Sequence, residues 1–355
     1  MPRLLHGSGL ALSAALCLSP AGARAQDWPT YLDLLRPERV VEHLLQAGIM
    51  GLRTQLDLRY GDISVNPATG YVALTEIELW PLPEWDAAGD CRIAADRLSI
   101  RSGGLDDPDR MRVRLQLSGG SAPGACLPPD MRPLLQAARL DRIELPRLTI
   151  DINYEISSAE AGLHVYGEAA QLAAVDLTAD FSYLWVEGRG GDDPVPVAFL
   201  SAAALSVENL GGWEALRPML PPPLSDPASA PAALEEMLGA LLEEANRKAA
   251  GAEQPVPLSA AQRAFVASVA GAWPAFLQDP ARLVLETGYA PEDDAYLDFA
   301  YYEGDLPALF DDLQPRLGRS AARQRAVLPA ALLRRGLGGE AQALPAAERL
   351  RLGRA

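Results

Sequence analysis

The chain has 355 residues, of which 47 are acidic and 31 basic, and its formal net charge at pH 7 is −16. A body this acidic repels nucleic acid, so we expect no nucleic-acid partner. Three histidines and three cysteines leave little material for a histidine triad or a multi-histidine metal site. We therefore expect no catalytic residue of these classes, no metal and no cofactor.

Residues 1–25 have the pattern of a secretory signal peptide. Arg3 precedes a nine-residue apolar run, 10–18, and Ala23-Arg24-Ala25 forms a small-x-small cleavage site. The run is much shorter than the roughly 20 residues that cross a bilayer, which favours a cleaved signal over an uncleaved anchor. Lys248 is the only lysine, an arginine bias typical of GC-rich bacterial genomes. We predict export to the periplasm.

Residues 26–51 are predicted to form an N-terminal helix. Pro37 suits a first helical position, and Val40, Leu44 and neighbouring apolar residues recur at helical spacing. We expect this helix to pack on the sheet that follows or to plug one of its ends.

Residues 52–210 are predicted to form an antiparallel sheet. Apolar and polar residues alternate in 111–117, 148–156 and 175–185, and this period of two is typical of strands with one buried face. The connections are short and rich in Gly, Pro and Asp, which leaves no room for crossover helices and favours a meander. A phase change within 71–80 predicts a bulge near Thr75 or Glu76.

Three aromatic residues, Phe181, Tyr183 and Trp185, share one parity of the predicted strand 175–185. Residues at this spacing point to one face of a sheet. An apolar face must be covered by helices or by something bound, so these three residues are the candidate ligand-binding site.

Cys91 and Cys126 remain after signal cleavage, and an even count in an oxidising compartment predicts a disulfide. Closing a loop of this length would stabilise the fold by about 4 kcal/mol in the chain-entropy model. The alternative is a redox or metal pair, but the spacing is neither C-x-x-C nor a zinc pattern.

Residues 211–315 are predicted to be a helical segment with short strands. Gly211-Gly212 and the proline-rich run 218–231 suggest a domain boundary. Two amphipathic helices follow. The second has a capping box at Ser259 and should stop or kink at Pro274.

Residues 316–355 carry nine Arg and two Glu, a surplus of seven positive charges. We predict a basic, flexible tail. It would either fray in solvent or make peripheral contact with an anionic membrane surface as an amphipathic helix.

The hairpin within 56–80 contains Gly61-Asp62-Ile63-Ser64-Val65-Asn66-Pro67, then Gly70 before the returning strand. It resembles the repeated element of AsmA-like β-rich envelope proteins of Gram-negative bacteria. The resemblance implies an open, curved antiparallel sheet with an apolar groove, a shape linked in that group to lipid handling and outer-membrane homeostasis. It carries no catalytic residues over to this chain.

Together these features predict an α+β fold: a long curved antiparallel β-sheet, a meander that is open or partly closed, with an N-terminal helix and a C-terminal helical segment. The predicted function is non-catalytic. The protein would bind an apolar ligand, such as a lipid chain, or an envelope partner protein on its sheet. The alternatives are a glycan hydrolase that uses paired carboxylates, and a purely structural envelope scaffold.

Overall fold

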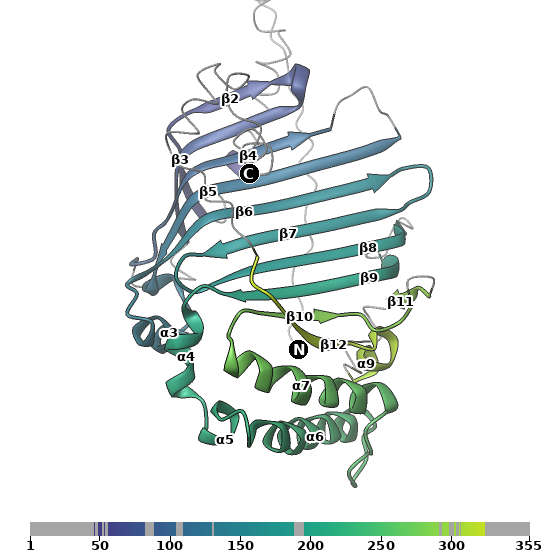
Figure 1. Cartoon of the computed structure of the whole chain (residues 1–355). Helices are drawn as coiled ribbons and strands as arrows, with labels where there is room; N and C mark the ends of the chain where they lie inside the picture. The colour runs from purple at the N-terminus through teal and green to yellow at the C-terminus, as the bar shows by residue number, and fades with distance from the viewer. Residues whose placement is uncertain are drawn as a thin grey trace, which may run out of the picture.

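The computed structural model describes residues 46, 49–51, 53, 56–81, 89–103, 109–129, 131–187, 195–290, 293–297, 302, 305 and 307–323. These residues form one open antiparallel sheet of twelve strands, with helices gathered beside its C-terminal edge (Figure 1). The predicted α+β class with a long antiparallel meander is confirmed. The predicted signal peptide and the part of the predicted tail beyond residue 323 lie outside the described residues.

The sheet is a meander in which each long strand pairs with its neighbours in the chain. Its order is β1-β3-β4-β5-β6-β7-β8-β9-β10-β12, with β2 on β3 and β11 on β9. The strands are β1 (Leu56–Arg59), β2 (Ile63–Asn66), β3 (Tyr71–Pro81), β4 (Ile93–Ser102), β5 (Arg110–Pro123), β6 (Arg142–Glu155), β7 (Ala161–Ala169), β8 (Ala173–Glu187), β9 (Val195–Asn209), β10 (Arg282–Glu286), β11 (Ala295–Leu297) and β12 (Arg316–Ser320).

The helices fall into two groups. The short helices α3 and α4 lie at the ends of strands, whereas α7 packs beside β10 and β12, α6 packs on α7, and α5 lies beside α6 (Figure 1). They are α3 (Arg132–Ala137), α4 (Gly212–Leu216), α5 (Pro222–Ser225), α6 (Ala230–Ala249), α7 (Ala260–Gln278) and α9 (Ala308–Leu313), with single 3-10 turns at Pro67–Thr69, Gly124–Cys126 and Arg217–Met219.

The boundary predicted at residues 211–231 does not divide the fold. Strand β10 pairs with β9, with Leu283 opposite Val207, so the chain on both sides of the proline-rich run builds one sheet. Prolines in this run occupy the first turns of α5 and α6, where the missing N–H has no helical partner to lose. Residues 316–320, predicted to begin the flexible tail, instead form the edge strand β12.

The predicted irregularity in β3 lies at Glu76, but it is not a bulge. Thr75 pairs with Arg97 and Ile77 with Ala95, so the register with β4 is the same on both sides of Glu76. Glu76 instead has a left-handed backbone with φ 51°. This conformation changes which side chains face the core without inserting a residue.

Helix α7 begins as predicted, because Ser259 and Gln262 form the capping box. The predicted stop at Pro274 was wrong, since the helix continues to Gln278. Phe276 is buried in the core that α7 shares with α4 and α6, and this packing offsets the hydrogen bond lost at the proline.

Of the predicted N-terminal helix, residues 46 and 49–51 are described, and they are helical. Ile49 is buried against Leu58 of β1, Ile77 of β3 and Ala95 of β4. These residues therefore pack on the sheet, as expected of the helix. The remainder of the segment lies outside the described residues.

Candidate functional site

One face of the sheet is apolar across its whole width. Leu177 on β8 lies opposite Val165 on β7 and Leu205 on β9, and the same side of the ladder continues through the neighbouring strands. Directly opposite residues point to the same face of an antiparallel sheet. We call this surface the apolar face; its central members are Val113, Leu115, Leu148, Ile150, Ile152, Leu163, Val165, Val175, Leu177, Leu205 and Val207.

The apolar face is covered at its margins and exposed between them. Ile49 packs at the β1–β4 side, and α9 packs near Leu163. Between these regions Ile152, Val175 and Val207 are 38%, 40% and 41% exposed. Val175 and Val207 lie directly opposite each other, whereas Ile152 lies opposite Leu163 in a separate row of the ladder. Exposed aliphatic side chains that share one sheet face are typical of a binding surface.

The structure does not bring the three predicted site residues together. Phe181 packs in the core formed by Ala198, Leu200 and α9. Tyr183 instead contacts Phe199, with ring centroids 6.3 Å apart. Phe199 is exposed whereas both of its chain neighbours are buried, so Phe199 and Tyr183 lie on the opposite face from Phe181. The prediction of one aromatic face was wrong.

Irregular pairing of β8 with β9 separates these residues. The register runs from Asp180 opposite Ala202 to Phe181 opposite Leu200, and then to Tyr183 opposite Phe199. One residue is therefore skipped on β9 and then one on β8, which reverses the facing of the residues that follow. Trp185, two residues after Tyr183, is 51% exposed.

The apolar face leads into a cavity that the sequence did not indicate. The cavity lies where β8 begins and β9 ends, and residues of α3 and α4 line it. Figure 1 shows both helices at this end of the strands. The other lining residues of the cavity come from β6, α7, β10 and the adjoining loops, and the full set is Leu127, Met131, Leu135, Ala138, Ile143, Leu172, Ala173, Val207, Asn209, Gly212, Trp213, Ala215, Leu216, Phe276 and Leu283.

Asn209 positions α4, one of the helices that line this cavity. Its side-chain oxygen accepts hydrogen bonds from the backbone nitrogens of Gly211 and Trp213, both at 3.0 Å. A Cβ on Gly212 would lie 2.7 Å from the carbonyl oxygen of Leu172. Glycine is therefore needed for α4 to approach the β7–β8 turn this closely.

The predicted disulfide is present and holds the opposite wall. Cys91 and Cys126 are bonded, with their Cα atoms 4.6 Å apart, which confirms the pairing. Cys126 directly precedes Leu127, the first residue of the wall that continues into α3. Arg132 closes this segment by donating to the carbonyl oxygens of Leu127 and Ala125, each at 3.1 Å.

The cavity suits a hydrocarbon. Its volume is about 250 Å³, larger than the roughly 150 Å³ apolar cavity that admits benzene in an engineered protein. Asn209 is the only lining residue with an amide, hydroxyl or charged side chain, and its amide already bonds Gly211, Trp213 and the carbonyl oxygen of Pro280. The Trp213 indole N–H is the other polar side-chain group, so the lining offers a polar ligand few hydrogen-bonding partners.

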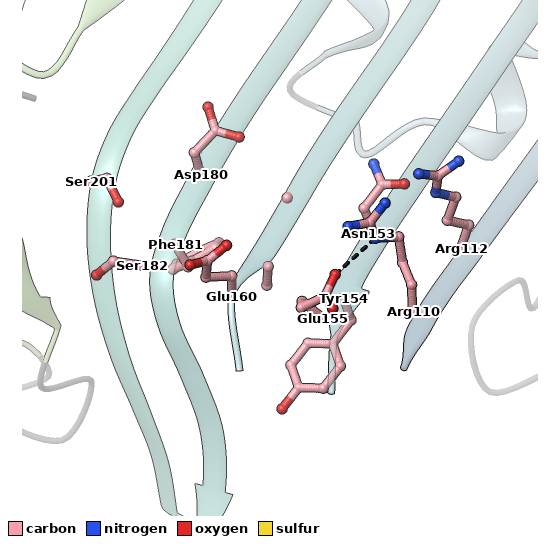
Figure 2. Close-up of a pocket in the computed structure, with 12 residues that line it drawn as sticks. Arg110, Arg112, Asn153, Tyr154, Glu155, Glu160, Asp180, Phe181, Ser182 and Ser201 are labelled. Carbon is pink, nitrogen blue, oxygen red and sulfur yellow. Dashed lines mark hydrogen bonds and ion pairs between the residues drawn. The ribbon is translucent and has the colours of Figure 1, made fainter. Parts of the chain in front are cut away.

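The other face of the sheet is polar and contains open clefts. One of them, about 550 Å³ in volume, is shown in Figure 2. It contains the carboxylates Glu155, Glu160 and Asp180, which the glycan-hydrolase alternative would require in a cleft. Glu155 is bound to Arg110 at 2.7 Å, so this carboxylate already has a cationic partner at the cleft.

Within the described part of the chain, no group of three or more His, Cys, Asp or Glu side chains is placed to hold a metal ion. The described helices include none with both the length and the hydropathy of a bilayer-crossing helix. In comparisons with known proteins, no family model matches the chain, and no curated protein matches it.

Proposed function

We propose that this protein is a non-catalytic envelope protein that binds the hydrocarbon chain of a lipid. The chain would lie on the apolar face with its end in the cavity that α3 and α4 help to line. The observation that carries the proposal is the predominantly apolar lining of this cavity, in which the one amide side chain, Asn209, is already hydrogen bonded.

The position of the cavity opening favours a long ligand over a compact one. Val207 lines the cavity and is 41% exposed, so the cavity opens onto the apolar face at this residue. Val175 lies directly opposite Val207 in the ladder and is equally exposed. A chain that left the cavity would continue along these side chains and remove apolar surface from water, at about 25 cal/mol per Å².

Export to the periplasm is part of the proposal. The leader pattern from Arg3 to Ala25 supports it, and the Cys91–Cys126 disulfide is compatible with an oxidising compartment. The open sheet with an apolar face also fits the lipid handling that the resemblance to AsmA-like proteins implies. An envelope protein docking on the same face is the alternative occupant.

Binding of a fluorescent long-chain fatty acid to the purified protein tests the proposal. Ala173 lines the cavity at the start of β8, and Ala173→Phe should fill the space and weaken binding by about tenfold, the loss of a few buried methylenes. Ala204 on β9 pairs with Thr178 on the polar face, so Ala204→Phe is the matched control and should bind like wild type.

Native mass spectrometry of the purified protein, before delipidation, provides the second measurement. We expect a mass increment of one lipid in the wild type and its reduction in Ala173→Phe, with both variants melting as cooperatively as wild type. Saturable binding that Ala173→Phe leaves intact, or an absence of binding by delipidated wild type, would refute the cavity as the site.

A further inference from the structure

A cleft on the polar face collects positive charge in an otherwise acidic protein. It has a volume of about 320 Å³ and lies over β3, β4 and β5. Its lining contains three guanidinium groups, a phenol, two hydroxyls and one amide, and no carboxylate: Arg97, Arg101, Arg114, Tyr71, Ser99, Ser118 and Gln116. We call it the arginine cleft.

The arginines are held close together by the strand register. Arg101 on β4 lies directly opposite Arg114 on β5, an arrangement of like charges that destabilises a sheet unless a counter-charge is present. Asp151 on β6 supplies one, because it accepts hydrogen bonds from Arg114 Nε and, at 3.2 Å, from Arg114 Nη2. This carboxylate lies on the far side of Arg114 from Arg101.

Arg97 and Arg101 contact the ring of Tyr71 rather than a carboxylate. Their guanidinium carbons lie 5.8 and 5.5 Å from the centre of the Tyr71 ring, and Arg97 donates to the Tyr71 hydroxyl at 2.6 Å. Among the described residues neither arginine forms an ion pair. The ring orients both cations but does not neutralise them.

We propose that the arginine cleft binds a phosphate group, as a soluble phosphate ester or as the headgroup of a phospholipid. Planar guanidinium groups match the paired oxygens of a phosphate, and charge-assisted hydrogen bonds of this kind are about twice as strong as neutral ones. The Ser99 and Ser118 hydroxyls lie in the same lining as further donors. The bound anion supplies the counter-charge that Arg101 lacks.

This inference does not rest on the proposed function, because the cleft and the cavity lie on opposite faces. Ile100 and Leu115, the chain neighbours of Arg101 and Arg114, belong to the apolar side of the ladder. Ala173→Phe should therefore leave phosphate binding unchanged. A failure to bind fatty acid would therefore count against the proposed function alone, and a failure to bind phosphate would count against the arginine cleft alone.

Calorimetric titration with inorganic phosphate and with glycerol phosphate at low ionic strength tests the proposal. We expect one site per chain in the wild type, and Arg101→Gln should weaken its affinity by about tenfold. Arg142 is an exposed arginine at the start of β6, outside the cleft, so Arg142→Gln removes the same charge and should leave binding unchanged.

Sedimentation with phosphatidylglycerol vesicles separates the two sources of phosphate. Recruitment that Arg101→Gln reduces and Arg142→Gln preserves would assign the cleft to a lipid headgroup. Binding of glycerol phosphate without recruitment to vesicles would assign it to a soluble ester. The proposal is overturned if the wild type binds neither ligand, or if both variants weaken binding equally, since binding would then follow net charge alone.

Discussion

The side-chain oxygen of Asn209 accepts a hydrogen bond from the backbone nitrogen of Trp213 at 3.0 Å, and this contact ties the end of β9 to the helix above the cavity. Trp213 in turn is buried against Phe276 of α7, with ring centroids 5.2 Å apart. One short side chain thus joins the sheet, α4 and the helical core at the site where we place the end of the ligand.

Asn209→Ala should lower the free energy of unfolding by about 2 kcal/mol, because two backbone nitrogens lose their acceptor. It should also weaken fatty-acid binding, since α4 would no longer be fixed over the cavity. Urea unfolding and the fluorescence titration measure the two effects. Asn153→Ala, at an exposed position on the polar face of β6, is the control and should change neither.

The double variant Cys91→Ser/Cys126→Ser should lose about 4 kcal/mol of stability, because the unfolded chain regains the entropy of an open loop. Hydrocarbon binding should weaken with it, since Cys126 anchors the wall that contains Leu127. Titration in the presence and absence of a reductant is the measurement. The reductant should weaken binding by the wild type and leave the double variant unchanged; an effect on both would mean that it acts elsewhere.

Glu76→Gly should raise the free energy of unfolding by about 1 kcal/mol. Glu76 is exposed and has φ 51°, a left-handed conformation that costs a side-chain-bearing residue about 1 kcal/mol more than it costs glycine. Thr75→Gly, one residue earlier in extended backbone, should lower stability by about the same amount. Denaturation curves that show both variants destabilised would contradict the backbone strain assigned to Glu76.

Gln262→Leu should lower the free energy of unfolding by about 2 kcal/mol. Gln262 is 1% exposed, and it exchanges hydrogen bonds of 2.8 and 2.9 Å with the Asn246 side chain across α6 and α7. The single variant leaves the buried amide of Asn246 without these partners. Gln278→Leu, at the exposed end of the same helix, should stay within about 0.5 kcal/mol of wild type.

A double-variant cycle sharpens this prediction. Adding Asn246→Leu to Gln262→Leu should cost less than the sum of the single changes, because no buried amide is then left unpaired. Additive losses would show that the two amides do not act as a pair.

Much of the architecture could be predicted from the sequence, because the sequence patterns of strands, turns and helix caps involve residues that are close together in the chain. The alternation at 111–117 sets which side chains of a strand share a face, and short turns then impose antiparallel neighbours. Ser259 and Gln262 cap α7 through contacts within one turn. Cys91 and Cys126 were predictable as a pair because the third cysteine, Cys17, lies within the predicted signal peptide.

The candidate site could not be predicted from local sequence patterns. The alternation of Phe181, Tyr183 and Trp185 continues unbroken in the sequence, yet skipped residues in the β8–β9 register place Phe181 and Tyr183 on opposite faces. Register between strands depends on how two chain segments pair, so the spacing within one segment does not reveal it.

The sequence by itself determined a strand-rich chain with an antiparallel sheet and one disulfide, because periodicity, turn residues and cysteine count act over short distances. Only the tertiary structure decided that the helical segment extends the same sheet through β10 and β12. It also decided where the cavity and the arginine cleft lie, because each collects side chains from several strands or helices, and their proximity arises from packing and register rather than from spacing along the chain.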